Sequence, residues 1–348
     1  MSATQSYPQN DAPGAISSEQ PQPEEILLDV QHLSKRFPVV SSRLSKSRDY
    51  IHAVSDVSFQ IKKGEAFGLV GESGCGKTTI GKILVNLYRA SAGAIFYKGV
   101  DLAALKPKER KKYHRDIQMI FQDPYSSLNP RMKVGDIIAE PIITNKLMPA
   151  AEVEDRVDNL LECVGLANYA RNRYPHEFSG GQRQRIGIAR ALAMDPKLII
   201  CDEPVSALDV SIQAQVLNLL DDLKKEFGLT YLFIAHGLNV IKHVSDKVGV
   251  MYLGKMLEVA SKEELFANPC SPYTQALLSA APVIDPAKKR ERIILEGEVT
   301  SPLNPPEGCR FSNRCFKKID LCDGQEPPLV EIGENHFCAC HLYAKNLI

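Results

Sequence analysis

The segment Gly71–Thr78 has the residue types and spacing of a loop that binds the phosphates of a nucleotide. It reads Gly-Glu-Ser-Gly-Cys-Gly-Lys-Thr and fits the pattern G-x-x-x-x-G-K-S/T in full. The glycines let backbone N–H groups turn toward phosphate oxygens, and the following helix adds its positive end. We expect Lys77 to reach the β- and γ-phosphates and Thr78 to ligate Mg²⁺. The predicted nucleotide contacts here are Gly71, Glu72, Ser73, Gly74, Cys75, Gly76, Lys77, Thr78 and Thr79.

Two carboxylates follow an apolar run at 198–201, at the point where a buried strand is expected to end. Asp202 is placed to hold Mg²⁺, and Glu203, which points differently, to polarise an attacking water. An apolar run that ends in Asp-Glu is a weak signal alone. Together with the phosphate-binding loop it indicates a site that hydrolyses a nucleotide.

A third motif, Ser179-Gly180-Gly181-Gln182, opens a helical run 23 residues before Asp202. Backbone N–H groups at the start of a helix form an anion cradle, which makes these four residues candidate nucleotide contacts. In isolation, a capped helix after a flexible loop is an equally good interpretation.

These motifs need a sheet and helices that hold them together. Strands are expected at 66–70, 116–121, 196–204 and 230–236, alternating with helices, and this order predicts an α/β fold with a buried parallel sheet. Residues 124–195 have helical periodicity and form an expected insert, while the apolar segment 248–259 follows as a single element.

Composition narrows the class of protein. The 348 residues carry 42 Lys+Arg and 42 Asp+Glu, so the net charge is zero, which argues against a protein that coats nucleic acid or an anionic membrane. Residues 1–25 hold four prolines and no basic residue, and we expect them to be disordered. Nothing resembles a signal peptide or an 18-residue apolar span, so a cytoplasmic protein without a transmembrane segment is predicted.

The combination of these three motifs resembles the ATP-binding subunits of ABC transporters. The resemblance implies an α/β P-loop NTPase fold: an ABC nucleotide-binding domain with an antiparallel β subdomain and a helical subdomain. It implies ATP and Mg²⁺ as ligands, catalytic roles for Glu203, Gln122 and His236, and a further Mg²⁺ contact for Gln122. It also assigns Asp209, in the segment 206–209, to the nucleotide site. His236 is implied to be the family's switch histidine, which contacts the γ-phosphate. The residue after it is usually Asp in the family, and this chain departs from that pattern with Gly237.

An aromatic residue that stacks on adenine is also implied. Tyr50, 27 residues before Lys77, is the candidate, and Phe37 is its rival.

The segments 126–142, 271–280 and 301–315 resemble more narrowly the F-type ATPases of oligopeptide/dipeptide permeases, from Ile26 to Leu342. This implies an ABC ATPase domain at 26–268, with a helical subdomain at about 124–195, and a small Cys-rich C-terminal extension at 269–348. ATP-driven closure of a head-to-tail dimer would drive peptide import at the cytoplasmic face of the bacterial inner membrane. The implied partners are a second ATP-binding subunit in a heterodimer, two transmembrane permease subunits and an extracytoplasmic peptide-binding protein, with no nucleic acid.

Two alternatives stay open at this point. One is a soluble ABC ATPase that acts on nucleic acid or ribosomes, although this chain has one copy of each motif and no long coiled-coil insertion. The other is the same type of transporter with nickel, glutathione or another small cargo.

The nine cysteines are unevenly spread, and five lie in the last 40 residues. Cys309, Cys315, Cys322 and Cys340 are candidate ligands of Zn²⁺ or of a 4Fe–4S cluster. The absence of a short C-x2-C spacing favours iron–sulfur, and the family tail is similar. Cys338 is a spare thiol and His341 an alternate ligand, while ordinary free cysteines remain the competing interpretation.

Overall fold

The computed structural model describes residues 25–39, 49–280, 291–298, 300–305 and 307–344. The predicted disordered tail lies outside these residues, apart from Glu25. Within the described parts of the chain, no helix combines the length and apolar character that a bilayer crossing requires.

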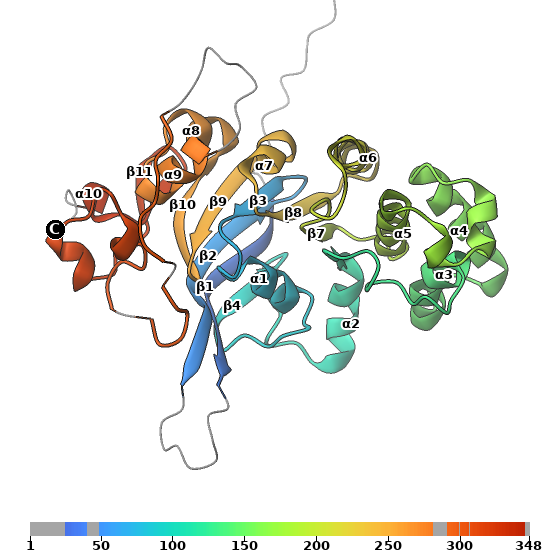
Figure 1. Ribbon diagram of the computed structural model, residues 1–348. Helices are drawn as coiled ribbons and strands as arrows, with labels where there is room; N and C mark the ends of the chain where they lie inside the picture. Colours follow the sequence, from blue (N-terminus) through green and yellow to red (C-terminus); the bar gives the residue numbers. More distant parts are fainter. Residues whose placement is uncertain (1–24, 40–48, 281–290, 299, 306, 345–348) are drawn as a thin grey trace, which may run out of the picture.

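The central element is an eight-stranded sheet with the order β11-β12-β10-β9-β3-β8-β7-β6 (Figure 1). The strands β9, β3, β8, β7 and β6 run parallel, and every residue of β3, β7 and β8 is buried, as the continuous apolar runs predict. The bounds of its strands are β3 Ala66–Val70, β6 Ile117–Ile120, β7 Leu198–Asp202, β8 Thr230–Ala235, β9 Lys247–Tyr252, β10 Lys255–Ser261, β11 Val330–Gly333 and β12 His336–Cys338.

The prediction of a single element at 248–259 is wrong. The chain turns at Leu253 and Gly254, which have φ values of 44° and 81°, and β10 returns antiparallel to β9. Both strands are apolar and Leu253 is no typical turn residue, so the hydrophobic pattern alone does not reveal the turn.

A second, antiparallel sheet has the order β2-β1-β4-β5. Its strands are β1 Ile26–Pro38, β2 Tyr50–Lys62, β4 Ala92–Tyr97 and β5 Val100–Asp101. Its apolar residues, such as Val30 and Phe59, form one buried core with Phe67 of β3 and Ile80 of α1 (Lys77–Leu84). The antiparallel sheet and α1 therefore cover one face of the main sheet.

The other face of the main sheet belongs to a core that continues into the helices. Figure 1 shows α3, α4 and α5 gathered at one end of the molecule, beyond β7. The helices after α1 are α2 Pro107–Asp116, α3 Val134–Asn145, α4 Val153–Cys163, α5 Gly180–Leu192, α6 Val210–Phe227, α7 Leu238–Val244, α8 Lys262–Ala267, α9 Pro272–Ala280 and α10 His341–Ala344. The predicted fold class, with its antiparallel and helical parts, is confirmed.

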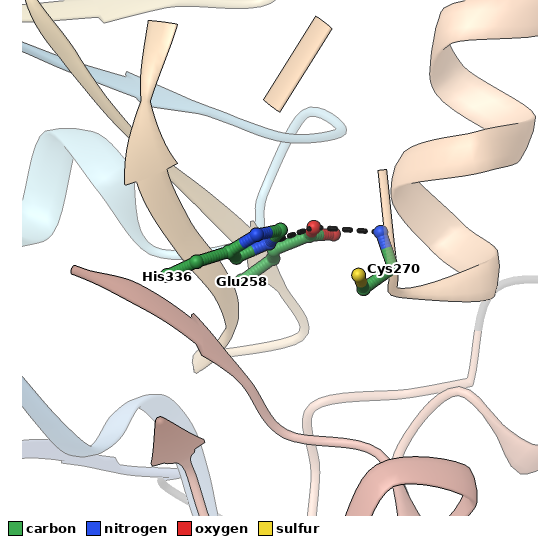
Figure 2. Close-up of side chains that lie close together, drawn as sticks. All are labelled: Glu258, Cys270 and His336. Carbon is green, nitrogen blue, oxygen red and sulfur yellow. Dashed lines mark hydrogen bonds and ion pairs between the residues drawn. The ribbon is translucent and has the colours of Figure 1, made fainter. Parts of the chain in front are cut away.

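The C-terminal region joins the main sheet, because β12 pairs with β10 and β11 with β12. A buried polar cluster secures this joint (Figure 2). The fully buried Glu258 carboxylate accepts hydrogen bonds from the backbone N–H groups of Cys270, at 2.8 Å, and Ser271, at 2.9 Å. His336 Nε2 lies 2.8 Å from Glu258 Oε1. We call this set the Glu258 clasp, since it ties β10, the segment before α9 and β12 together.

The clasp also groups three types of metal ligand, since atoms of Glu258, Cys270 and His336 lie within 4.8 Å of one another. Both carboxylate oxygens already accept hydrogen bonds from the protein, which is how a buried carboxylate is stabilised without an ion. The arrangement is therefore explained as a structural contact.

The clasp predicts a pH-dependent contribution to stability. The hydrogen bond to Glu258 raises the pKa of His336 above its ordinary value, and Glu264, with Oε1 3.5 Å from Nδ1, acts in the same direction. Stability from the imidazolium is fully present below the unfolded pKa, about 6.5, and is lost as the pH rises through the raised folded pKa. We expect His336→Gln to destabilise the protein by about 1–3 kcal/mol at pH 6 and by less at pH 9.

Thermal unfolding of the wild type and of His336→Gln at pH 6 and pH 9 measures the loss of stability at each pH. The matched control is His32→Gln, because His32 also pairs with a carboxylate, Asp56, but its side chain is 79% exposed. Equal destabilisation by His336→Gln at both pH values would contradict the assignment.

Candidate nucleotide-binding site

Four neighbouring parallel strands bring the predicted site residues to one edge of the main sheet. In the order β3-β8-β7-β6, the strands are followed by Gly71, His236, Glu203 and Gln122. Because the strands are parallel, their carboxyl ends meet at the same edge, which is where open α/β sheets place ligands. Motifs scattered over 166 positions of the sequence thus become neighbours.

The glycines at the two ends of the phosphate-binding loop are required by the backbone. Gly71 has a φ of 152°, and a Cβ there would lie 2.0 Å from the Met251 carbonyl oxygen. Gly76 has a φ of 104°, and a Cβ would lie 2.1 Å from the carbonyl oxygen of Ala53. No other residue type fits either position without moving backbone.

Lys77 lies inside this loop and is only 3% exposed. Its ammonium donates hydrogen bonds to the carbonyl oxygens of Gly71, at 2.6 Å, and Glu72, at 3.0 Å. Burial raises the pKa of the neighbouring Cys75 thiol, which favours a packing role for Cys75 over a nucleophilic one.

Thr78 and Asp202 form a pair of oxygen donors next to the loop. The Thr78 hydroxyl donates to Asp202 Oδ1 at 2.8 Å, although the two residues are far apart in sequence. Burial raises the pKa of the Asp202 carboxyl, which is 2% exposed. A hydroxyl and a carboxylate fit Mg²⁺, a hard cation that takes oxygen ligands.

Glu203 is held between two other predicted site residues. Gln122 Nε2 donates to Glu203 Oε2 at 2.6 Å, and His236 Nε2 lies 2.5 Å from Oε1. Glu203 has a φ of 47°, a strained backbone value of the kind that clusters at functional sites. Burial raises the pKa of its carboxyl, as suits a general base.

Gly237, the departure from the expected pattern, does not disturb the local turn. It is the N-cap residue of α7 with a φ of −98°, and a Cβ there would meet nothing within 4 Å. The helix starts normally and lacks only a side-chain acceptor at its N-cap.

The Ser179–Gln182 motif forms the start of α5, one of the helices gathered at one end of the molecule (Figure 1). Ser179 Oγ accepts the Gln182 backbone N–H at 3.3 Å, and Gln182 Oε1 accepts that of Ser179 at 3.0 Å. Gly181 packs on Ile212, where a Cβ would lie 2.5 Å from Cγ2. Ser179, Gly180 and Gln182 are exposed, as is Asp209, the N-cap residue of α6.

The two adenine-stacking candidates lie where β1 ends and β2 begins, since Phe37 pairs with Ile51 and Tyr50 pairs with Pro38. Tyr50 begins β2, and its backbone N–H donates to Asn304 Oδ1 at 3.3 Å. The Phe37 ring packs edge-on against Tyr88, with centroids 5.4 Å apart. Both side chains are partly exposed, so the choice between them remains a prediction.

Two contacts of the phosphate-binding loop were missed by the sequence analysis. Arg314 Nη1 lies 2.8 Å from Glu72 Oε2, and the Tyr273 hydroxyl accepts the Glu72 backbone N–H at 2.9 Å. These partners follow Glu72 by 242 and 201 residues, and no local pattern marks them.

The four predicted cysteine ligands line one small pocket. Cys309, Cys315, Cys322 and Cys340 share it with His341, whose Nε2 donates to the Gln325 carbonyl oxygen at 2.9 Å. All nine cysteines are free thiols. Burial raises the pKa of Cys309 to about 11, and the other three thiols of the pocket act in the same direction. Cys338 instead lies in β12, at the register position opposite Glu258 of β10.

Comparison with known proteins adds two family matches. Residues 54–206 match the family "ABC transporter", and residues 257–322 match "Oligopeptide/dipeptide transporter, C-terminal region". The chain is 53% identical to the oligopeptide transport ATP-binding protein AppF of Bacillus subtilis, covering 92% of this chain and 98% of the relative. It is 46% identical to the dipeptide transport ATP-binding protein DppF of Escherichia coli, covering 91% and 95%.

Solved structures give the same result for the fold. CbiO1 from Clostridium perfringens, described as part of the ABC transporter complex cbiONQ, is 28% identical with a TM-score of 0.60, covering 70% of this chain and 92% of that one. The ATP-binding cassette MJ0796, described as dimeric and bound to ADP and Pi, is 27% identical with a TM-score of 0.59, covering 68% and 99%.

The loop geometry predicts that Gly71→Ala disrupts the site. The added methyl group would meet the Met251 carbonyl oxygen, so we expect a loss of at least about 2 kcal/mol in stability and of nucleotide binding. Thermal unfolding and titration with a fluorescent nucleotide measure the two effects. Gly187→Ala is the matched control, because Gly187 lies inside α5, where a Cβ meets nothing within 4 Å. Normal binding by Gly71→Ala would contradict the geometry.

Proposed function

The chain belongs to the ATP-binding subunits of oligopeptide and dipeptide ABC transporters, and on that premise we propose that the strand-end site is where it binds and hydrolyses ATP to drive peptide import. One observation carries the assignment. Glu203 is fixed between Gln122 and His236, next to a phosphate-binding loop and a Thr78–Asp202 oxygen pair. The family matches favour this function over an ABC ATPase that acts on nucleic acid or ribosomes.

Each residue of the site has a distinct role in this proposal. The loop Gly71–Thr79 surrounds the phosphates and Lys77 neutralises their charge. Thr78 and Asp202, with Gln122, would hold Mg²⁺, which supplies further neutralisation of the phosphate oxygens when bound. Glu203 accepts a proton from the attacking water, and His236 contacts the γ-phosphate. Tyr50 stacks on the adenine.

A second ATP-binding subunit completes the site. Ser179, Gly180, Gly181, Gln182 and Asp209 would contact a nucleotide that is bound mainly by the partner, in a head-to-tail heterodimer. The exposure of Ser179, Gly180 and Gln182 at the start of α5 supports the proposal. The neighbouring Val210 is 82% exposed, as expected for an apolar side chain that a partner covers.

The membrane partners would be two transmembrane permease subunits, supplied with peptide by an extracytoplasmic binding protein. In this proposal the chain works at the cytoplasmic face of the bacterial inner membrane. A surface pocket next to Gln122 could bind a loop of a permease subunit. Its lining includes Gln118, Phe121, Glu140 and Arg190. Cargo identity, whether peptide, nickel or glutathione, would be set by those partners.

We assign the ABC ATPase domain to 26–268, with its helical subdomain at about 124–195, and the C-terminal extension to 269–348. The positions of α3, α4 and α5 support the bounds of the helical subdomain. The extension shares the main sheet through β12, so it would not fold apart from the ATPase domain.

A 4Fe–4S cluster is the proposed occupant of the cysteine pocket, with zinc as the alternative. The fit is chemical: four unpaired thiols line one pocket, and their protons would leave on metal binding. The four cysteines lack the short C-x2-C spacing that is typical of zinc ribbons, which favours a cluster over zinc.

The catalytic assignment predicts that Glu203→Gln keeps ATP binding and loses most turnover. The amide preserves the shape of the side chain and one acceptor oxygen but cannot accept a proton from water, so kcat should fall at least about 100-fold. ATP hydrolysis by the assembled transporter and nucleotide titration of the chain measure the two properties. Unchanged hydrolysis would refute the role of Glu203.

The pocket assignment predicts about four iron atoms per chain in protein purified without oxygen. Elemental analysis and visible absorption detect them without reference to activity. The variant Cys315→Ser should lose iron, whereas Cys163→Ser, a thiol remote from the pocket, should retain it. Protein that contains neither iron nor zinc would exclude both occupants.

A further inference from the structure

Glu72 connects the phosphate-binding loop to the C-terminal extension through its backbone N–H and its carboxylate, while its carbonyl oxygen is bonded within the loop. Its carbonyl oxygen accepts a hydrogen bond from Lys77 at 3.0 Å, and its backbone N–H donates to the Tyr273 hydroxyl at 2.9 Å. Its carboxylate lies 2.8 and 3.0 Å from Arg314 Nη1. The lysine that meets the phosphates and the arginine of the extension thus act on the same residue.

Arg314 is held firmly enough to fix its partner. Its side chain is 11% exposed and that of Glu72 is 28% exposed, so solvent screens the pair only in part. Nη1 also lies 3.4 Å from the Tyr252 hydroxyl, and the guanidinium carbon lies 5.9 Å from the Tyr252 ring centre. A planar, permanently charged group in these surroundings has few alternative positions.

An aromatic cluster anchors this part of the extension against the ATPase domain. Tyr252 at the end of β9, Tyr273 of α9 and Phe311 lie with ring centres 4.8 to 5.2 Å apart. Phe311 precedes Arg314 by three residues, and Tyr273 is the residue that accepts the Glu72 N–H. The cluster therefore holds in place both residues that contact Glu72, Tyr273 and Arg314.

A second connection reaches the loop through Arg310. Its guanidinium donates to the Leu253 carbonyl oxygen and, at 2.9 Å, to Ser55 Oγ. Gly254, which follows Leu253, donates its N–H to the Cys75 carbonyl oxygen at 3.0 Å. The extension thus supports the loop near Glu72 directly and near Cys75 through the β9–β10 turn.

We infer that Arg314 is a positioning residue for ATP: by holding Glu72 it fixes the phosphate-binding loop in its binding conformation. This rests on the proposed function, because it assumes that Lys77 and the loop bind ATP. Without the contact, the loop would have to be ordered when the nucleotide binds, and the cost would appear as weaker affinity.

Two substitutions separate positioning from simple attraction of the phosphates. Arg314→Met keeps the length of the side chain and removes its charge, while Glu72→Gln removes the opposite charge. If Arg314 acted only as a positive charge, Glu72→Gln would strengthen ATP binding. If the pair positions the loop, both variants weaken ATP binding. The Kd of the double variant is then no higher than that of the single variant with the higher Kd.

The experiment is a titration of the full-length chain with mant-ATP and Mg²⁺, together with KM and kcat of the assembled transporter. We expect Kd and KM to rise about three- to tenfold in both variants, with kcat changed less than about twofold. Lys318→Met is the matched control, because Lys318 pairs with Asp323 at 2.8 Å in the same extension. It should bind mant-ATP like the wild type.

Three results would overturn the inference alone. They are an unchanged Kd for Arg314→Met, a lower thermal midpoint without a change in Kd, and tighter binding by Glu72→Gln. A wild-type chain that does not bind mant-ATP would overturn the proposed function as well.

Discussion

The parallel pairing of β3, β8, β7 and β6 is the constraint on which the site depends. It places the carboxyl ends of four strands at one edge, so that the loop after β3 lies near residues that follow the other three. No motif contains enough groups to hold both nucleotide and Mg²⁺. The sheet combines them, and its fully buried strands β3, β7 and β8 leave little freedom for one group to move relative to another.

Charge at this edge is buried and must be balanced. Lys77, Asp202 and Glu203 are each no more than 5% exposed, and burial raises the pKa of both carboxyls. Each charged group has a named hydrogen-bond or ion-pair partner, which offsets part of the cost of leaving water. Groups fixed in this way are oriented before the substrate arrives, which is the basis of electrostatic catalysis.

The fold class and the central site residues were predictable because their signals are local. A glycine-rich loop after an apolar strand and Asp202-Glu203 at a strand end are read within a few residues. The turn at Leu253 and Gly254 was missed, because a single glycine between two apolar strands is a weak turn signal when the strands read as one apolar run. Arg314 and the Glu258 clasp were not predictable, since their contacts join residues up to 242 positions apart. The choice between Tyr50 and Phe37 depends on a nucleotide pose that the sequence does not specify.

The most direct test of the central claim is a structure of the chain with Mg²⁺ and a non-hydrolysable ATP analogue. The account predicts that the Lys77 ammonium moves from the Gly71 and Glu72 carbonyl oxygens to the β- and γ-phosphates. It also predicts Mg²⁺ on Thr78 Oγ1 with Asp202 in its coordination shell, and Glu203 beside the γ-phosphate. Density for the analogue elsewhere, with Lys77 still on the two carbonyl oxygens, would contradict the account.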